Sequence, residues 1–139
     1  MMVHTTNYFD TFIEVADDCP AVTGQTPPLN VSAPSVATIQ FELISQHPYT
    51  FTSDEIIFRV YAIRNDLAAS DYAIAKKEFF SKGQACLRSS ALGKRYGWGI
   101  HADHQGKVAL IGLETDDYKK YCSDISLKKV KAMRSKKAK

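Results

Sequence analysis

The stretch Tyr96–Glu114, YGWGIHADHQGKVALIGLE, decides the fold class that this sequence predicts. Two runs rich in aromatic and β-branched residues flank the turn-forming residues His104, Gln105 and Gly106. Runs of this kind on either side of a short glycine-containing turn are typical of a β-hairpin. We therefore expect two antiparallel strands within residues 96–114.

The residues upstream of this hairpin show helical patterns. Thr52 and Glu55 form a capping box ahead of IIFRVYAIRND, in which apolar residues recur at helical spacing. Residues 36–44 favour a helix capped by Ser35, although their alternation of apolar and polar side chains also fits a strand. A third helix is expected over residues 71–82, where Gly83 would end it.

The residues downstream of the hairpin are also expected to be helical. Thr115 is followed by two aspartates and YKKYC, which is a typical start of a short helix. Ser126 can cap a last helix over residues 127–136, whose apolar side would include Val130 and Met133. The C-terminal part of the chain is thus predicted to contain two helices.

One further strand and one loop complete the predicted elements. Residues 11–16, TFIEVA, combine β-branched and aromatic residues and indicate an early strand. Residues 19–34 contain four prolines and a glycine, so we expect a loop there. Because strands and helices do not alternate as in βαβ units, the order indicates an α+β fold.

The fold expected from these elements is a single compact α+β domain over residues 1–139. A small antiparallel sheet, made of the 96–114 hairpin and the 11–16 strand, would pack on three to five helices. A chain of 139 residues can bury roughly 68% of its unfolded surface around one core. Its ends, residues 1–7 and 136–139, are expected to fray.

Two features of the sequence bear on the cellular compartment of the protein. The first residues show no basic segment followed by an unbroken apolar run, and nowhere do about eighteen apolar residues follow one another. The three cysteines, Cys19, Cys86 and Cys122, form no CxxC pair. We expect a reduced, soluble, cytoplasmic protein that does not enter a membrane.

The net charge of +3 is unevenly distributed along the chain. Residues 1–81 contain four Lys and Arg against ten Asp and Glu. Residues 82–107 contain five basic residues against one acidic residue, and residues 127–139 contain seven against none. Clustered cations of this kind attract polyanions, although a basic chain end is more often simply solvated.

The segment Lys82–His104 is the most site-like part of the sequence. It combines cations with glycines and aromatic residues, and arginine can bind a phosphate or carboxylate through two donors. The alternative interpretation is a glycine-containing strand whose aromatic residues pack in the core. The residues that we expect to bind an anionic ligand are Lys82, Arg88, Lys94, Arg95 and His101.

Strand parity divides this segment into two faces. In an extended strand, Tyr96, Trp98 and Ile100 would point to the core, while Arg95, His101 and Asp103 would point to the other face. Glycines at positions 97 and 99 would leave that second face shallow. We expect the binding surface on it.

Weaker candidates for catalysis are His101, Asp103 and Cys86. His101 could act as a general acid or base oriented by Asp103, and Cys86 has the cations Lys82 and Arg88 near it in sequence. A free cysteine is more often a small buried apolar residue. The common catalytic and nucleotide-binding fingerprints are missing, so we predict no cofactor and no metal site.

The chain also resembles a family of short, uncharacterised microbial proteins described only as a domain of unknown function. The resemblance rests on NYFDTFIEVADDCP, HPYTFTSDEIIF, FFSKGQACLRSSALGKRYGWGIH, GKVAL and LKKVKAMRSK, and the FFSKGQACLR to KRYGWGIH block is the specific part. It extends from Asn7 to Lys137. The resemblance implies one domain and implies no activity, substrate or site residue.

Three functions follow as hypotheses. The first is a binding module for an anionic small ligand or nucleic acid, using the basic and aromatic surface around residues 82–101, assisted by the basic residues of 127–139. The second is a small enzyme with His101 and Asp103 as an acid–base pair. The third is a structural or homodimeric interaction protein.

Overall fold

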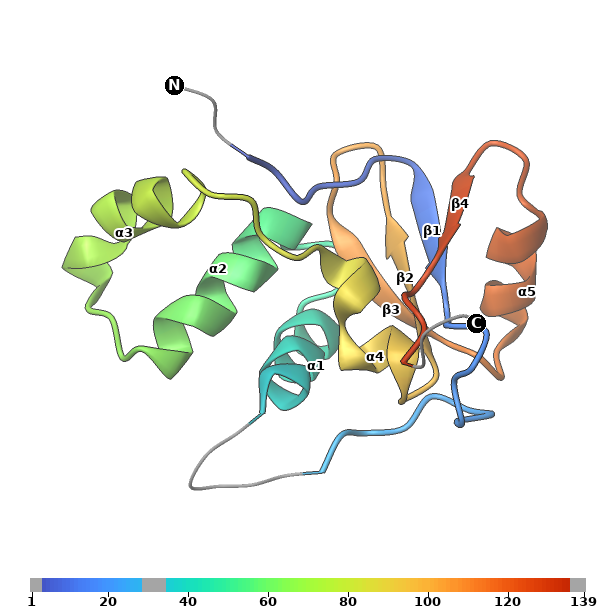
Figure 1. The fold of residues 1–139 in the computed structure, drawn as a ribbon. Helices are drawn as coiled ribbons and strands as arrows, with labels where there is room; N and C mark the ends of the chain where they lie inside the picture. Colours follow the sequence, from blue (N-terminus) through green and yellow to red (C-terminus); the bar gives the residue numbers. More distant parts are fainter. Residues whose placement is uncertain (1–3, 29–34, 136–139) are drawn as a thin grey trace.

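The computed structural model describes residues 4–28 and 35–135, which form a single compact α+β domain. A mixed sheet of four strands lies at one end of the molecule in Figure 1, and the helices α2 and α3 extend away from it. The predicted fold class is confirmed.

The sheet has the strand order β3-β2-β1-β4. Its strands are β1 (Thr11–Glu14), β2 (Trp98–Ala102), β3 (Val108–Gly112) and β4 (Lys128–Lys131). The predicted hairpin is confirmed, since β2 and β3 are antiparallel neighbours, and β1 pairs antiparallel with β2. The early strand and the hairpin therefore belong to one sheet.

The first two helices upstream of the hairpin follow the predicted caps. The strand alternative for residues 36–44 is wrong, because α1 (Val36–Gln46) begins at Ser35, whose side chain accepts a hydrogen bond from the Thr38 amide. Helix α2 (Ser53–Arg64) has the complete capping box of Thr52 and Glu55. Helix α3 (Tyr72–Phe79) follows the 3₁₀ turn η1 (Ala69–Asp71). Its predicted end at Lys82 and Gly83 is wrong, because the helix stops at Phe79, whose carbonyl accepts a hydrogen bond from the Gln84 side chain.

Two short elements precede β2, and one helix follows β3. The 3₁₀ turn η2 (Leu87–Ser89) and helix α4 (Ala91–Lys94) were not predicted, because they are too short for a periodic pattern. Helix α5 (Asp116–Ser123) is confirmed, with Thr115 accepting a hydrogen bond from the Tyr118 amide.

The helix predicted over residues 127–136 is wrong. Residues 128–131 form β4, which pairs parallel with β1 at the edge of the sheet. The Lys128 amide donates to the Asp10 carbonyl at 2.9 Å, and the Ala132 amide donates to the Glu14 carbonyl at 2.8 Å. Pairing with a strand that is distant in sequence thus overrides the weak helical pattern.

Helices cover both faces of the sheet (Figure 1). On one face Ile13, Ile100 and Ala102 pack with the buried side chains of α1 and α4. On the other face Phe12 contacts Tyr118 of α5, with ring centroids 5.1 Å apart. Both faces are therefore closed by packing.

The ends and the loop are only partly described. Residues 1–3 and 136–139 of the predicted frayed ends, and residues 29–34 of the predicted loop, lie outside the described residues. The backbone of residues 4–7 forms hydrogen bonds, for example from the Thr6 amide to Asp54 Oδ1 at 2.6 Å. Residues 19–28 contain neither helix nor strand.

Within residues 4–28 and 35–135, no helix combines the length and apolar character needed to cross a bilayer.

Candidate functional site

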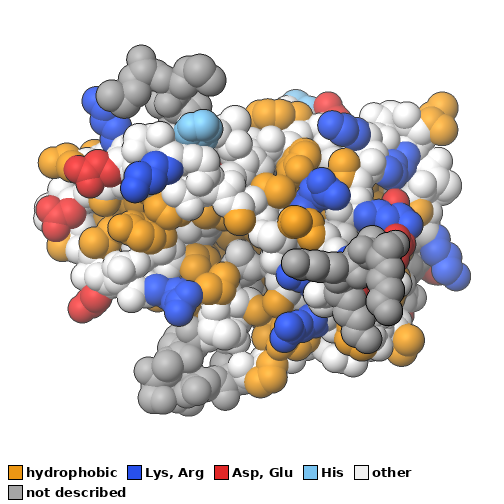
Figure 2. Space-filling view, viewed as in Figure 1, with side chains coloured by type: hydrophobic (Ala, Val, Ile, Leu, Met, Phe, Trp, Pro, Cys, Tyr) orange, Lys and Arg blue, Asp and Glu red, His pale blue; other side chains and the backbone are white. Residues whose placement is uncertain are grey.

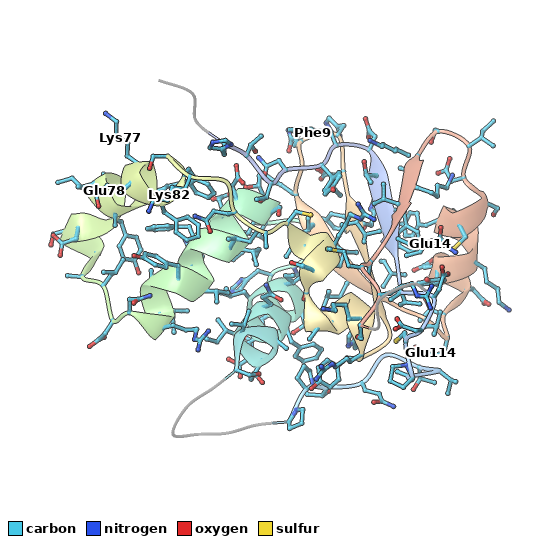
Figure 3. The ribbon with its side chains drawn as sticks, in the orientation of Figure 1. Phe9, Glu14, Lys77, Glu78, Lys82 and Glu114 are labelled. Atoms are coloured by element: carbon cyan, nitrogen blue, oxygen red, sulfur yellow. The ribbon has the colours of Figure 1, made fainter. Side chains whose placement is uncertain are left out.

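The five predicted ligand-binding residues lie in three separate places. Arg88, Lys94 and Arg95 lie on η2 and at the end of α4, next to β4. Lys82 follows α3, at the opposite end of the molecule (Figure 3). His101 lies on the sheet face that α5 covers. We call the first group, together with Lys128 and Arg134, the β4 basic surface.

Arg88 joins the two basic parts of the sequence. Its Nε donates a hydrogen bond to the Lys131 carbonyl at 2.7 Å, and the Met133 amide donates to the Arg88 carbonyl at 2.8 Å. The 82–107 segment and the C-terminal basic segment are therefore neighbours in space.

Helix α4 brings two more cations to the same edge. Its Gly93 carbonyl accepts a hydrogen bond from the Ala16 amide, and a Cβ placed on Gly93 would lie 2.9 Å from that of Ala132. The close approach places Lys94 and Arg95 beside the residues that follow β4. Figure 2 shows Lys and Arg side chains over this part of the molecule.

One lysine of β4 is already paired. Lys131 Nζ lies 2.6 Å from Asp17 Oδ1, and this carboxylate raises the pKa of the lysine. Both side chains are largely exposed, so the pair contributes little to stability. We therefore leave Lys131 out of the β4 basic surface.

The aromatic residues of the segment belong to the fold. Trp98 and Tyr96 pack against the main core, and Trp98 Nε1 donates to the Gln25 carbonyl at 2.8 Å. The Trp98 ring also lies against Phe41, with centroids 5.6 Å apart. These rings stabilise the α1 side of the sheet.

His101 forms an aromatic cluster with two tyrosines. Its ring stacks on Tyr121 of α5 at a centroid distance of 4.3 Å, and its Nδ1 is hydrogen-bonded to Tyr49 Oη at 2.8 Å. Burial lowers the pKa of His101, while the carboxylates of Asp103 and Asp10 act in the opposite direction. Burial also raises the pKa of Tyr49. The cluster therefore favours neutral rings.

Asp103 has a structural task in the hairpin turn. Its Oδ1 accepts hydrogen bonds from the Gln105 and Lys107 amides, each at 2.9 Å. This arrangement is a typical use of aspartate in a turn. The carboxylate thus supports the hairpin as well as the electrostatic surroundings of His101.

The prediction of a shallow sheet face beside His101 is wrong. A Cβ on Gly99 would lie 2.7 Å from Phe12 Cζ and 2.8 Å from Tyr118 Cε2, so aromatic rings fill the space above this glycine. The Tyr118 hydroxyl accepts a hydrogen bond from the Val15 amide, and burial raises its pKa to about 12. Helix α5 closes the face that strand parity left open.

Cys86 lines a hollow between α1, α2 and the 84–91 segment. The hollow has a volume of about 370 Å³, and a hydrogen bond of 2.5 Å joins buried Ser90 and Gln40 beside it. Cys86 Sγ lies 3.6 Å from Tyr8 Oη. Burial raises the pKa of Tyr8, while Arg88 acts in the opposite direction. Among the described residues that line this hollow, none is a histidine that could act as a base.

The sequence interpretation did not place several residues of these surfaces. Lys128 and Arg134 were expected to assist binding as part of the basic segment 127–139, but that segment was assigned to a helix. The sequence did not indicate that Tyr49 and Tyr121 contact His101, because they come from a turn and from α5. Among the described residues, no group of three His, Cys, Asp or Glu side chains is arranged to hold a metal ion.

The fold and these surfaces define the class of protein. It is a single α+β domain with a four-stranded mixed sheet, a basic edge at β4 and a hollow beside Cys86. The chain belongs to the family of unknown function DUF6157, whose family model matches residues 3–138. The predicted family resemblance is confirmed. The searches of curated proteins and of solved structures gave no match.

Proposed function

We propose that the protein is a binding module that holds the phosphate backbone of a nucleic acid on the β4 basic surface. The observation that supports this most directly is the contact of Arg88 with β4. Through it, two basic segments that are separate in sequence lie side by side, with Asp17 at Lys131 and Asp18 at Ser135 as acidic neighbours. Phosphate contacts by Lys and Arg provide most of the affinity of such non-specific binding.

An extended polyanion fits this surface better than a single small anion. Lys128, Arg95 and Arg134 are exposed along an edge of the molecule. Selective binding of a small anion needs donors that converge in a concave site. Charges spread along an edge suit a ligand whose own charges repeat, as they do along a duplex.

The packing of the aromatic residues favours backbone contacts over base contacts. Trp98 and Tyr96 are held by the core, so they are not available as stacking platforms for unpaired bases. We therefore propose binding that depends weakly on nucleotide sequence.

We also propose a cytoplasmic location, which the three free cysteines support.

The test is the binding of a fluorescently labelled DNA duplex to the full chain, followed by anisotropy between about 50 and 200 mM salt. We expect the logarithm of the association constant to fall linearly with the logarithm of the salt concentration, by about 0.9 for each phosphate contacted. The double variant Arg95→Gln/Lys128→Gln should reduce this slope by about 2 and weaken binding.

Lys76→Gln/Lys77→Gln is the matched control, since it also removes two positive charges, here from exposed positions of α3 (Figure 3). It should leave the slope unchanged. Binding that is independent of salt, or equal losses in the control and the double variant, would disprove the proposal. Displacement of the duplex by stoichiometric pyrophosphate would instead identify a small-anion site.

The two other functions predicted from the sequence stay predictions. They are an enzyme with His101 and Asp103 as its acid–base pair, and a homodimeric interaction protein. The contacts among the described residues support neither of these two functions as directly as they support binding to the β4 basic surface.

A further inference from the structure

Three adjoining hollows lie along α2, between this helix and residues of α1, α3 and the 81–91 segment. The hollow beside Cys86 shares Val36, Ile57 and Val60 with a second hollow of about 440 Å³. The second hollow shares Tyr61 and Phe79 with an open one of about 590 Å³. Gln84 lines all three. We call these adjoining hollows the α2 groove.

The walls of the α2 groove combine apolar and polar side chains, and the apolar ones are concentrated on α2. Ile57, Val60 and Tyr61 come from α2, and the ring of Tyr61 packs against that of Phe79, with centroids 4.7 Å apart. From Ile57 to Arg64 the helix rises by about 10 Å, at about 1.5 Å per residue. The groove is therefore long enough for an extended apolar chain. Figure 2 shows hydrophobic side chains exposed over the α2 and α3 end of the molecule.

Cations lie where the groove opens. Arg64 lines its middle part, and Lys82 lines its open end, where Glu78 is the acidic neighbour (Figure 3). Over the middle and open parts together, two positive charges stand against one negative charge. The other end, beside Cys86, is lined among the described residues by uncharged side chains. The groove thus has an uncharged end and a part with a net positive charge.

Gln84 is fixed at the junction of the three hollows. Its Nε2 donates a hydrogen bond of 2.7 Å to the Phe79 carbonyl at the end of α3. This bond ties the 80–86 segment to α3, so the groove wall opposite α2 is held in place. A preformed wall reduces the ordering cost of binding.

We propose that the α2 groove binds an amphipathic anion, with its unbranched hydrocarbon chain along Ile57 and Val60 and its carboxylate at Arg64 and Lys82. Burial of the chain provides affinity, which rises with each CH₂ group removed from water. The two cations select the sign of the head group. This site is separate from the β4 basic surface and does not depend on nucleic-acid binding.

The test uses octanoate as the probe and the full chain labelled with ¹⁵N. We expect amide shifts that saturate with octanoate and map to α2, Val36 and Gln84. Octyltrimethylammonium has the same chain and the opposite charge, and acetate has the same head without the chain. Both should bind at least about tenfold more weakly than octanoate, which corresponds to about 1.4 kcal/mol.

Variants separate the groove from the rest of the surface. Arg64→Gln should weaken octanoate binding about tenfold, whereas Lys77→Gln should leave it unchanged. Val36→Trp places a large ring at an exposed position that lines two of the hollows, so it should block binding. Far-ultraviolet circular dichroism checks that each variant is folded.

Three results would overturn the proposal. One is equal binding of octanoate and octyltrimethylammonium, and another is a set of shifted amides outside the groove. The third is unchanged octanoate affinity in Arg64→Gln, a substitution of an exposed side chain that does not endanger folding. Because duplex binding is measured separately, the failure of one proposed site is distinguishable from the failure of the other.

Discussion

Burial and nearby carboxylates act in opposite directions on the charge of the His101 ring. Stacking on Tyr121 and the hydrogen bond to Tyr49 hold the ring in a half-buried position, where loss of water disfavours the imidazolium. The nearby carboxylates of Asp103, Asp10 and Asp124 favour it, yet burial is the larger influence and the pKa is lowered. The folded protein therefore holds His101 in its neutral form at pH 7.

This lowered pKa predicts a pH dependence of stability. As the pH falls through about 6.5, the ordinary pKa of histidine, the unfolded chain takes up a proton before the folded protein does. The free energy of unfolding should then be highest above that pH and decrease below it. Urea unfolding at about pH 7.5 and about pH 5.5 measures the change.

The control for this experiment is His101→Gln, which has no titrating ring. The wild type should lose more stability than the variant between the two pH values, because all other groups are common to both. An identical loss in the two proteins would contradict the assignment of the effect to His101.

At the scale of elements, the N-terminus of α2 is stabilised by a local motif. Thr52 Oγ1 accepts a hydrogen bond from the Glu55 amide at 3.3 Å, and Glu55 Oε1 accepts one from the Thr52 amide at 3.0 Å. Asp54 also accepts hydrogen bonds from the backbone and side chain of Thr6, which attach the start of the chain to this helix. The capping box thus stabilises the start of the helix, and Asp54 attaches the N-terminal segment to it.

We predict that Thr52→Ala lowers the free energy of unfolding by about 1 kcal/mol, because it removes the side-chain partner of the Glu55 amide. Thermal or urea unfolding measures the loss. Thr52→Ser retains the hydroxyl and should recover most of the stability. If serine and alanine were equally destabilising, the hydroxyl would not be the cause.

The elements differ in how far the sequence could predict them. The caps at Ser35, Thr52 and Thr115 were visible, because each depends on residues within one helical turn. Strand β4 was not, since its four residues become a strand only by pairing with β1. The same pairing brings the C-terminal cations to Arg88, so the main candidate surface could not be assembled from the sequence.

At the scale of the whole molecule, the side chains pack in two clusters of unequal size. The main core lies between the sheet, α1 and α4, and includes Leu87 and Leu92. The second cluster lies between α2 and α3, with Phe58, Ala62 and Phe80 at its centre. No residue of α3 itself is buried, and Ile74 is 69% exposed. Helix α3 is therefore the least embedded of the three longer helices upstream of the hairpin.

We predict that α3 opens without unfolding of the whole domain. Native-state hydrogen exchange should give its amides a smaller opening free energy than those of Ile100 and His101 in β2, because little buried surface is lost when α3 detaches. Hydrogen exchange is measured by NMR or mass spectrometry at a series of low urea concentrations. This series distinguishes the opening free energy of the α3 amides from that of the β2 amides. Equal opening energies would indicate one cooperative unit.

The sequence by itself determined the α+β class, the hairpin, the capped helices and the uneven charge, because each depends on neighbouring residues or on composition. Tertiary structure alone decided the strand β4, the covering of His101 by α5, the separation of Lys82 from Arg88, and the α2 groove. Each of these depends on contacts between residues far apart in the chain. Strand parity could state that His101 points away from Ile100, but only the packing of α5 determined what it would meet.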